Sequence, residues 1–190
     1  MFLALIALCI SGNLEGGWQI IAVDSDQVKH VKGYLDRNLP HLFPEIANGE
    51  YVIASAKMQI VAGMKLKLNI KATSSPLLFQ LTLYINPQQK ITLEEITRPI
   101  GSRPILGGYT WQNPSHFTAK DLSNVVQLIQ RKLNLLLQRE GEVLVYRTKV
   151  EKGLKTHVIF RDSKQNVVSA VTLRSPNGKS EELVSANQIF

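Results

Sequence analysis

The chain has 190 residues, of which 44% are hydrophobic, and it carries a formal net charge of +7 at pH 7. This apolar content excludes an intrinsically disordered chain, and the length suits one large domain or two small ones. The charge is uneven: residues 13–98 hold 9 Lys and Arg against 8 Asp and Glu, whereas residues 99–190 hold 13 against 7, giving net charges of +1 and +6. An anionic partner would therefore be expected to bind the second half.

The first twelve residues form an apolar segment that ends in small side chains. The segment is too short to span a bilayer and resembles a secretory signal peptide, although it lacks basic residues at its start. We expect residues 1–12 to be removed and the remaining chain to be secreted; a buried first strand is the alternative. The single cysteine, Cys9, lies in this segment, so the mature chain would have no disulfide and no thiol nucleophile. No later stretch has transmembrane length, so we expect no membrane partner.

An amphipathic helix is predicted to follow. Asp24, Ser25 and Asp26 supply N-cap candidates and negative charge for its start. Its apolar residues recur at intervals of three and four positions, at Val28, Val31, Leu35, Leu39 and Leu42. The two prolines at positions 40 and 44 place its end between residues 38 and 43.

Four runs of alternating apolar and polar residues come next, at residues 51–58, 64–71, 79–85 and 91–97. In the second run, Leu66, Leu68 and Ile70 alternate with lysine and asparagine, which predicts a strand with one dry and one wet face. One helix followed by a four-stranded antiparallel meander would bury the helix stripe against the dry face of the sheet. The first half is therefore predicted to have an α+β fold.

Two turns of this meander carry distinctive residues. A short segment that ends in glycine, Gln59 to Gly63, joins the first two runs and predicts a β-hairpin with an exposed tip. The sequence Asn-Pro-Gln-Gln at positions 86–89 predicts the turn between the last two runs.

The same order of elements repeats after residues 99–104, whose two prolines and one glycine predict a linker. Thr118 and Asp121 resemble a capping box at the start of a second helix. Strands are predicted at residues 143–150, 154–160, 167–173 and 181–185. The inner face of the second helix is predicted to be lined by Leu122, Val125, Val126, Ile129, Leu133, Leu136 and Leu137.

Three landmarks repeat at nearly one spacing. Gly16 and Gly107 are 91 residues apart, Gly63 and Gly153 are 90 apart, and prolines 87 and 176 are 89 apart. We interpret residues 13–98 and 105–190 as two tandem copies of one α+β unit, each with one helix packed on a four- to five-stranded antiparallel sheet.

The glycine before the first helix, the motif Gln-x-Val-x-Gly at positions 59–63 and a second turn with proline together resemble the cystatin family. The resemblance covers the mature chain twice, and the motif is eroded in the second copy. It implies reversible, non-covalent inhibition of papain-like (cathepsin-type) cysteine proteases by a wedge of three segments that enters the active-site cleft. The implied protease-binding residues are Leu14, Glu15, Gly16, Gln59, Ile60, Val61, Ala62, Gly63, Pro87 and Gln88.

Two departures from the family pattern affect the expected activity. Secreted cystatins have tryptophan after the second-turn proline, where this chain has Gln88, so binding is expected to be weaker by roughly thirtyfold. In the second copy, Lys149 stands for Gln59 and Glu151 for Val61. Because an unpaired carboxylate is costly to bury in an apolar cleft, we predict that the second copy does not inhibit these proteases.

No enzyme is predicted. The sequence lacks HExxH, GxSxG and P-loop motifs, and its four histidines are scattered. The adjacent Glu94 and Glu95 are expected on opposite faces of a strand, so they could not act on one substrate. We expect no cofactor and no metal site.

Two other functions stay open from the sequence. The first is a non-inhibitory cystatin-fold protein whose basic second half binds an anionic surface or polysaccharide. Arg147, Lys149, Lys152 and Lys155 would serve there, although a solvated strand face is the preferred interpretation of this cluster. Aromatic residues are not interleaved with these charges, so we expect no nucleic acid partner. The second is inhibition of metallocarboxypeptidases, as in latexin, which also has two cystatin-like domains.

Overall fold

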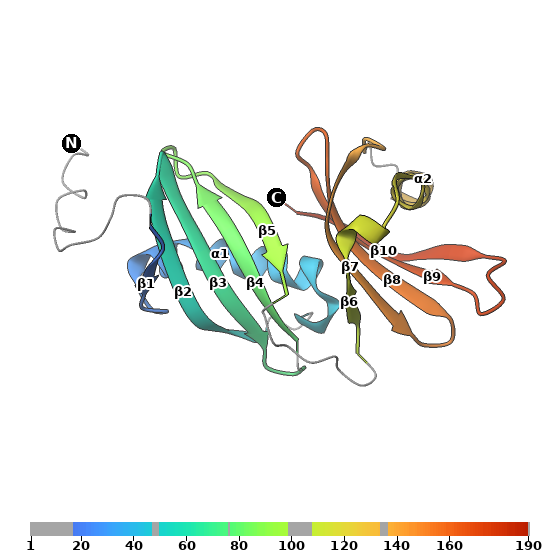
Figure 1. Ribbon diagram of the computed structural model, residues 1–190, viewed down its shortest axis with the longest axis horizontal. Coiled ribbons are helices and arrows are strands. Elements are labelled where there is room, and N and C mark those ends of the chain that lie inside the picture. The colour runs from blue at the N-terminus through green and yellow to red at the C-terminus, as the bar shows by residue number, and fades with distance from the viewer. Residues whose placement is uncertain (1–16, 47–49, 76, 99–107, 134–136, 190) are drawn as a thin grey trace.

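The protein contains two five-stranded antiparallel sheets and two helices, in an α+β arrangement (Figure 1). The computed structural model describes residues 17–46, 50–75, 77–98, 108–133 and 137–189. The expected signal peptide at residues 1–12, the site residues Leu14, Glu15 and Gly16, and the expected linker at residues 99–104 lie outside the described residues.

The first half begins with β1 (Gln19–Ile21) and α1 (Asp26–Leu42), followed by a short 3-10 helix, η1 (Pro44–Ile46). Four longer strands follow in chain order, and the sheet order is β1-β2-β3-β4-β5. Their bounds are β2 (Tyr51–Val61), β3 (Gly63–Ala72), β4 (Leu78–Ile85) and β5 (Ile91–Thr97). The predicted helix and four strands are confirmed, whereas β1 is too short to show an alternating pattern and was not predicted.

The second half repeats this order. It contains β6 (Thr110–Gln112), the 3-10 helix η2 (Pro114–His116) and α2 (Ala119–Leu133), then β7 (Gly141–Val150), β8 (Leu154–Asp162), β9 (Val167–Arg174) and β10 (Glu181–Ile189). The sheet order is β10-β9-β8-β7-β6. Equivalent irregularities interrupt both sheets, at residues 53–55 between β2 and β3 and at residues 143–145 between β7 and β8. The two sheets are therefore built on one plan with an offset of about 90 residues.

The predicted capping box of the second helix is confirmed. The Thr118 hydroxyl accepts a hydrogen bond from the Asp121 backbone N–H at 3.2 Å, and the Asp121 carboxylate accepts from the Thr118 N–H at 3.0 Å. Leu133 was wrongly predicted to be on the inner face, because it is 44% exposed. The helix ends at this residue, and Leu137 reaches the second core from the segment that follows.

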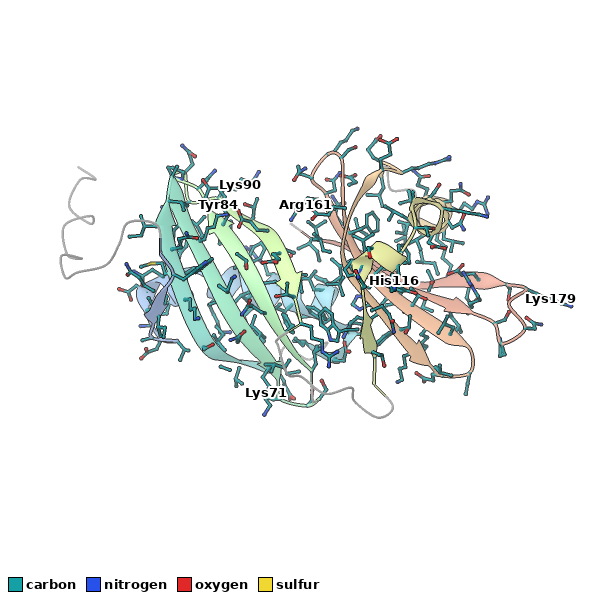
Figure 2. The ribbon with its side chains drawn as sticks, viewed as in Figure 1. Lys71, Tyr84, Lys90, His116, Arg161 and Lys179 are labelled. Carbon is teal, nitrogen blue, oxygen red and sulfur yellow. The ribbon has the colours of Figure 1, made fainter. Side chains whose placement is uncertain are left out.

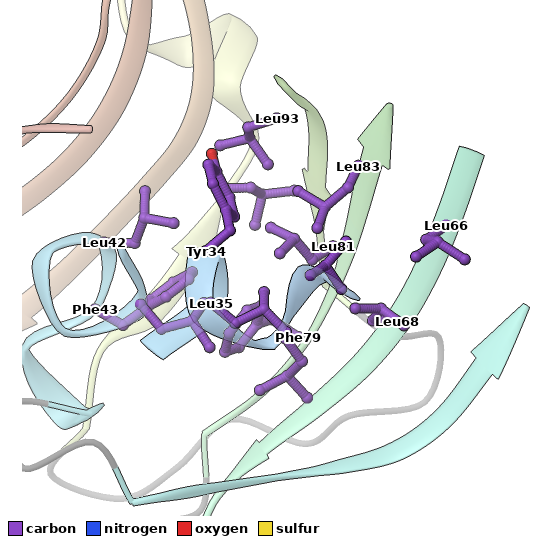
Figure 3. Packing of buried hydrophobic residues seen from close by; sticks show 14 of the residues in the cluster. Tyr34, Leu35, Leu42, Phe43, Leu66, Leu68, Phe79, Leu81, Leu83 and Leu93 are labelled. Atoms are coloured by element: carbon purple, nitrogen blue, oxygen red, sulfur yellow. The ribbon is translucent and has the colours of Figure 1, made fainter. Parts of the chain in front are cut away.

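The first hydrophobic core lies between α1 and the inner face of the first sheet (Figure 3). Leu35 and Leu39 of α1 pack against sheet residues that are almost fully excluded from solvent, namely Leu66, Leu68, Ile70, Phe79, Leu81 and Leu83. Phe43, which follows α1, contacts Phe79 with a distance of 4.1 Å between ring centroids. This core accounts for the 3.6-residue period of the helix and the two-residue period of the strands.

α1 also contacts the second half. The helix touches β9 and β10, and its end lies beside the second sheet in Figure 1. Five apolar residues of the second half join the first core, at Leu144, Val145, Ile159, Val167 and Ile189. The second sheet is therefore covered on one face by α2 and on the other by the end of α1, so the two halves pack together.

Arg147 is the polar centre of the contact between the halves. Its side chain is 0% exposed, and its two terminal nitrogens donate to the Glu45 carboxylate oxygens at 2.8 and 3.1 Å. The rings of Phe43, Tyr109 and Trp111 have centroids 4.9, 4.7 and 5.5 Å from the guanidinium carbon. The predicted solvated position of Arg147 is wrong, because the strand face that carries it is covered by the end of α1.

A chain of hydrogen bonds leads from Arg147 back to α1. The Arg147 Nε–H donates to His157 Nδ1 at 3.1 Å, and His157 Nε2 lies 2.9 Å from the Ser169 hydroxyl, which donates to the Leu42 carbonyl at 3.3 Å. Because arginine can only donate, Nδ1 must accept and the single imidazole proton lies on Nε2. Burial, and then the Arg147 charge, hold the pKa of His157 well below its ordinary value of 6.5.

Arg161 forms a second polar contact between the halves. This β8 side chain, labelled between the halves in Figure 2, donates to the backbone carbonyls of Leu93 at 2.6 Å and Glu94 at 2.9 Å. These carbonyls belong to β5, the edge strand of the first sheet. The contact therefore protects an edge that could otherwise pair with another chain.

Replacing Glu45 by Gln should strongly destabilise the protein. The substitution removes the counter-charge of a fully buried guanidinium, so the free energy of unfolding should fall by about 3 kcal/mol, measured by urea denaturation. The control is Glu142→Gln, which removes the partner of Arg161 at a side chain 65% exposed and should cost less than about 1 kcal/mol. Equal losses for the two variants would contradict this account of Arg147.

Acidification should weaken the fold through His157. The unfolded chain binds a proton at this imidazole below about pH 6.5, whereas the folded chain, in which the ring faces Arg147, Ser169, Phe43 and Tyr109, does not. The contribution to the free energy of unfolding therefore falls by up to about 1.4 kcal/mol per pH unit below that value.

Urea denaturation between pH 7.5 and 5.0 measures this effect, since the range lies above the ordinary pKa values of carboxyl groups. The variant His157→Gln should lose most of the decline. The variant His116→Gln, whose imidazole is exposed, should keep it. An unchanged decline in His157→Gln would show that another group is responsible.

Candidate functional site

One end of the first sheet gathers three chain segments. Val61 pairs with Gly63 at the turn between β2 and β3, and the pairing of Met64 with Ile85 places the end of β4 beside this turn. Gln19 pairs with Met58, so the chain enters β1 at the same end. The sheet register alone therefore brings the start of β1, the β2–β3 tip and the β4–β5 turn together.

This end of the sheet points away from the second half in Figure 1. Tyr84 and Lys90, which belong to it, are labelled at the upper left of Figure 2. Lys179, in the equivalent last turn of the second half, is labelled on the opposite side of the molecule. The hairpin tips of the two halves therefore face in different directions.

The β2–β3 tip is tighter than the sequence predicted. Gln59, Ile60 and Val61 belong to β2, and only Ala62 separates it from β3. Strand β2 thus continues through positions predicted as tip, because β-branched residues such as Ile60 and Val61 favour strand conformation. Ile60 is 57% exposed and Val61 is 38% exposed, so the tip presents apolar side chains to solvent.

Gly63 is required by the geometry of this tip. Its φ is 124°, and a Cβ atom at this position would lie 2.5 Å from the Ile85 carbonyl oxygen and 3.0 Å from the Tyr84 ring. Only glycine, which lacks a Cβ atom, adopts this positive φ and allows this close backbone approach without strain. The Tyr84 hydroxyl donates to the Ala62 carbonyl at 2.6 Å, which fixes the tip against β4.

The β4–β5 turn is held by its own backbone and by Asn86. The Asn86 side chain accepts a hydrogen bond from the Lys90 N–H at 2.8 Å, and the Gln89 N–H donates to the Asn86 carbonyl at 2.9 Å. Gln89 has a φ of 65°, which closes the turn. Pro87 and Gln88 are both exposed, so this turn also presents its side chains outward.

The third segment is represented by the two residues that precede β1. Gly17 and Trp18 are exposed, and the Lys67 ammonium lies 4.7 Å from the centre of the Trp18 ring. The three predicted site residues Leu14, Glu15 and Gly16 come directly before them in the sequence and lie outside the described residues.

The equivalent tip of the second half has the same backbone and different chemistry. Gly153 has a φ of 144°, and a Cβ there would lie 2.4 Å from the Arg174 carbonyl oxygen. Val150 is 85% exposed. Glu151, in the position of Val61, pairs with Lys149 at 3.0 Å and with Lys155 at 3.1 Å. The hydrogen bonds from these two lysines lower the pKa of Glu151, so the tip carries an ionised carboxylate.

The basic cluster predicted in the second half is largely neutralised. Arg147 is buried against Glu45, and Lys149 and Lys155 share Glu151. Among the described residues, only Lys152 of these four has no ion pair. The cluster therefore gives less support to an anionic partner than the sequence suggested.

The carboxylates Glu94 and Glu95 do not lie on opposite faces, as the sequence predicted. The register shifts between Thr82 and Leu83, so both acidic side chains lie on the outer face of the first sheet. Glu94 pairs with Lys65 at 2.9 Å, and Glu95 accepts a hydrogen bond from Thr82 at 3.4 Å. The bulge, which strict alternation cannot foresee, explains the error.

The described residues show no metal-binding cluster. Within them, no three His, Cys, Asp or Glu side chains lie close enough to hold a metal ion, and neither α1 nor α2 has the length and apolar character to cross a membrane. A cleft of about 220 Å³ beside Phe117 and Tyr146 is smaller than usual ligand sites. Its charged residues already have partners, since Arg174 pairs with Glu181 and Asp121 bonds Thr118.

No protein-family model matches the chain, and no curated protein matches it.

Tyr84 is the site residue that sequence reasoning missed. Its hydrogen bond to Ala62 spans 22 positions and depends on the pairing of β3 with β4. The only signal in the sequence was the position of a polar aromatic residue at the end of an alternating run, next to the predicted turn.

Replacing Gly63 by Ala should destabilise the protein by about 1–3 kcal/mol, because alanine disfavours this φ and its Cβ would meet the Ile85 carbonyl. The matched control is Gly33→Ala in α1, where an added Cβ meets nothing within 4 Å. That variant should stabilise the protein by about 0.5–1 kcal/mol, since alanine favours helix. Thermal and urea denaturation measure both changes, and a neutral Gly63→Ala would contradict the tip geometry.

Proposed function

We propose that residues 13–98 and 105–190 form two tandem cystatin-like units and that the first unit reversibly inhibits papain-like cysteine proteases. Inhibition occurs by insertion of loops into the active-site cleft, without a covalent bond. The observation that carries this proposal is the gathering of the β1 entry, the β2–β3 tip and the β4–β5 turn at one free end of the first sheet.

The shape and chemistry of this end support insertion into a cleft. The tip is narrow, and its exposed side chains at Ile60, Val61 and Ala62 are apolar. A partner cleft could remove these side chains from water without having to bury a charge. Leu14 and the exposed Pro87 and Gln88 would flank the tip on either side.

The rigidity of the tip supports the same function. Gly63 packs directly against the Ile85 carbonyl, and Tyr84 holds Ala62. Because the loop is already ordered before binding, little conformational entropy is lost when a protease closes around it. The inserted loops would then block the active-site cleft of the protease without reacting with it. The protein therefore acts as a binding protein and needs no catalytic group.

The second unit would not inhibit these proteases. Its tip places the ionised Glu151, with two lysine partners, where the first tip has Val61. Entry into an apolar cleft would strip water from this charge cluster, which is unfavourable. The absence of tryptophan after Pro87 should limit the affinity of the first unit, and the expected secretion would place both units outside the cell.

Introducing the second tip's carboxylate into the first tip should abolish tight inhibition. In an equilibrium assay with papain and cathepsin L, Val61→Glu in the chain from residue 13 should raise the inhibition constant at least about thirtyfold, because the new charge must be desolvated. A chain that begins at Gly17 should also inhibit more weakly, since it lacks Leu14. The reciprocal change Glu151→Val should leave the inhibition constants for both proteases unchanged.

Circular dichroism should show that Val61→Glu keeps its fold, because Val61 is an exposed residue at a strand end. If the unmodified chain at micromolar concentration leaves both proteases fully active, the proposed function is wrong. Inhibition of a metallocarboxypeptidase in the same assay format would favour the latexin-like alternative.

A further inference from the structure

The outer face of the first sheet is the exposed equivalent of a face that holds a carboxylate in the second sheet. In the first sheet, Ile20 lies opposite Lys57, which lies opposite Lys67. In the second sheet, Trp111 lies opposite Arg147, which lies opposite His157. Lys57 and Lys67 precede Arg147 and His157 by 90 positions each, which is the offset of the duplicated sheets.

In the second sheet, this face holds a segment of the same chain. Arg147 binds the Glu45 carboxylate through two nitrogens, and the Phe43 ring lies 4.9 Å from its guanidinium carbon. The occupant is therefore a short segment with an aromatic residue two positions before a glutamate. Tyr109 and Trp111 line the other side of the arginine.

In the first sheet, no described segment covers the equivalent face. Ile20 is 82% exposed, and Lys57 and Trp18 are also exposed. Among the described residues, no carboxylate lies within 4 Å of the Lys57 or Lys67 ammonium, whereas the neighbouring Lys65 already pairs with Glu94. Two like charges directly opposite each other on neighbouring strands repel, and an added carboxylate would relieve this repulsion.

We propose that this face, formed by Trp18, Ile20, Lys57 and Lys67, binds an acidic segment of a partner protein that combines a carboxylate with an adjacent apolar side chain. The carboxylate takes the position between the two lysines, and the apolar side chain covers Ile20 and Trp18. This site is separate from the β2–β3 tip and does not depend on protease inhibition.

The mixture of charge and apolar surface favours a protein segment over a polyanion. Among the described residues, only Lys57 and Lys67 on this stretch of the face lack a carboxylate partner, and the exposed Ile20 and Trp18 lie beside them, the centre of the Trp18 ring 4.7 Å from the Lys67 ammonium. A sulfated polysaccharide or a nucleic acid backbone would neutralise the lysines and leave the apolar side chains in water. Because an ammonium cannot form the paired hydrogen bonds of a guanidinium, the contact is expected to be weaker than the one at Arg147.

The test uses a fluorescein-labelled peptide with the sequence of residues 41–46, His-Leu-Phe-Pro-Glu-Ile, and measures fluorescence anisotropy with the full mature chain. We expect saturable binding that weakens at least about tenfold when the peptide glutamate is replaced by glutamine. The double variant Lys57→Gln/Lys67→Gln should weaken binding by a similar factor, and Ile20→Ser by at least about threefold. The control Lys152→Gln, which changes an exposed lysine elsewhere, should bind as the unmodified protein does.

Several results would overturn the proposal. These are the absence of saturation, equal binding of the glutamate and glutamine peptides, and binding that survives loss of both lysines. Tighter binding of a heparin oligosaccharide than of the peptide, lost in the same lysine variant, would assign the face to a polyanion. If the chain that begins at Gly17 binds the peptide at least tenfold more tightly, the face belongs to the chain's own first residues.

Discussion

The buried ion pair between Arg147 and Glu45 is the contact on which the arrangement of the two halves depends. A guanidinium without exposure to solvent is tolerated only when its charge is matched and its donors are satisfied. Glu45 matches the charge, a neutral His157 accepts one donor, and three aromatic rings surround the cation. Because Glu45 lies in η1, three residues after the last residue of α1, this pair fixes the end of the helix on the second sheet, and the first sheet's tips point away from the contact.

The duplicated units use equivalent surfaces for different purposes. The outer face of the second sheet is an internal contact, whereas the outer face of the first sheet is exposed to solvent at Ile20 and Lys57. The two tips differ in chemistry: the first tip is apolar, and the second tip carries the ion cluster around Glu151. The two tips thus differ in their side chains, while Gly63 and Gly153 make the same close backbone approach.

Much of the fold was predictable from local patterns. The helix stripe of Val28 to Leu42 and the alternation around Leu66 and Leu68 were correct, because burial of one face imposes these periods. Both three-residue strands, β1 and β6, were missed, since so short a segment has no measurable period. At the candidate site, Gly63 could be predicted because a positive φ favours glycine, and a glycine is visible in the sequence. Tyr84 was missed because its role depends on the pairing of β4 with β3.

The sequence by itself determined the duplicated α+β plan, the order of the strands and the position of the glycine-ended tip. Only the tertiary structure decided which charges remain available. Arg147 lies 102 positions from Glu45 in the sequence. The alternation of β7 predicts on which face of the sheet Arg147 lies, but it does not predict which segment covers that face. The sequence charge therefore pointed to the second half, while burial against Glu45 and pairing with Glu151 occupy Arg147, Lys149 and Lys155 there, and Lys57 and Lys67 of the first sheet have no carboxylate partner among the described residues. The periodicity of a helix or strand shows which of its faces is buried against its own sheet. It does not show which distant element packs on the other face, because that contact is set by tertiary packing.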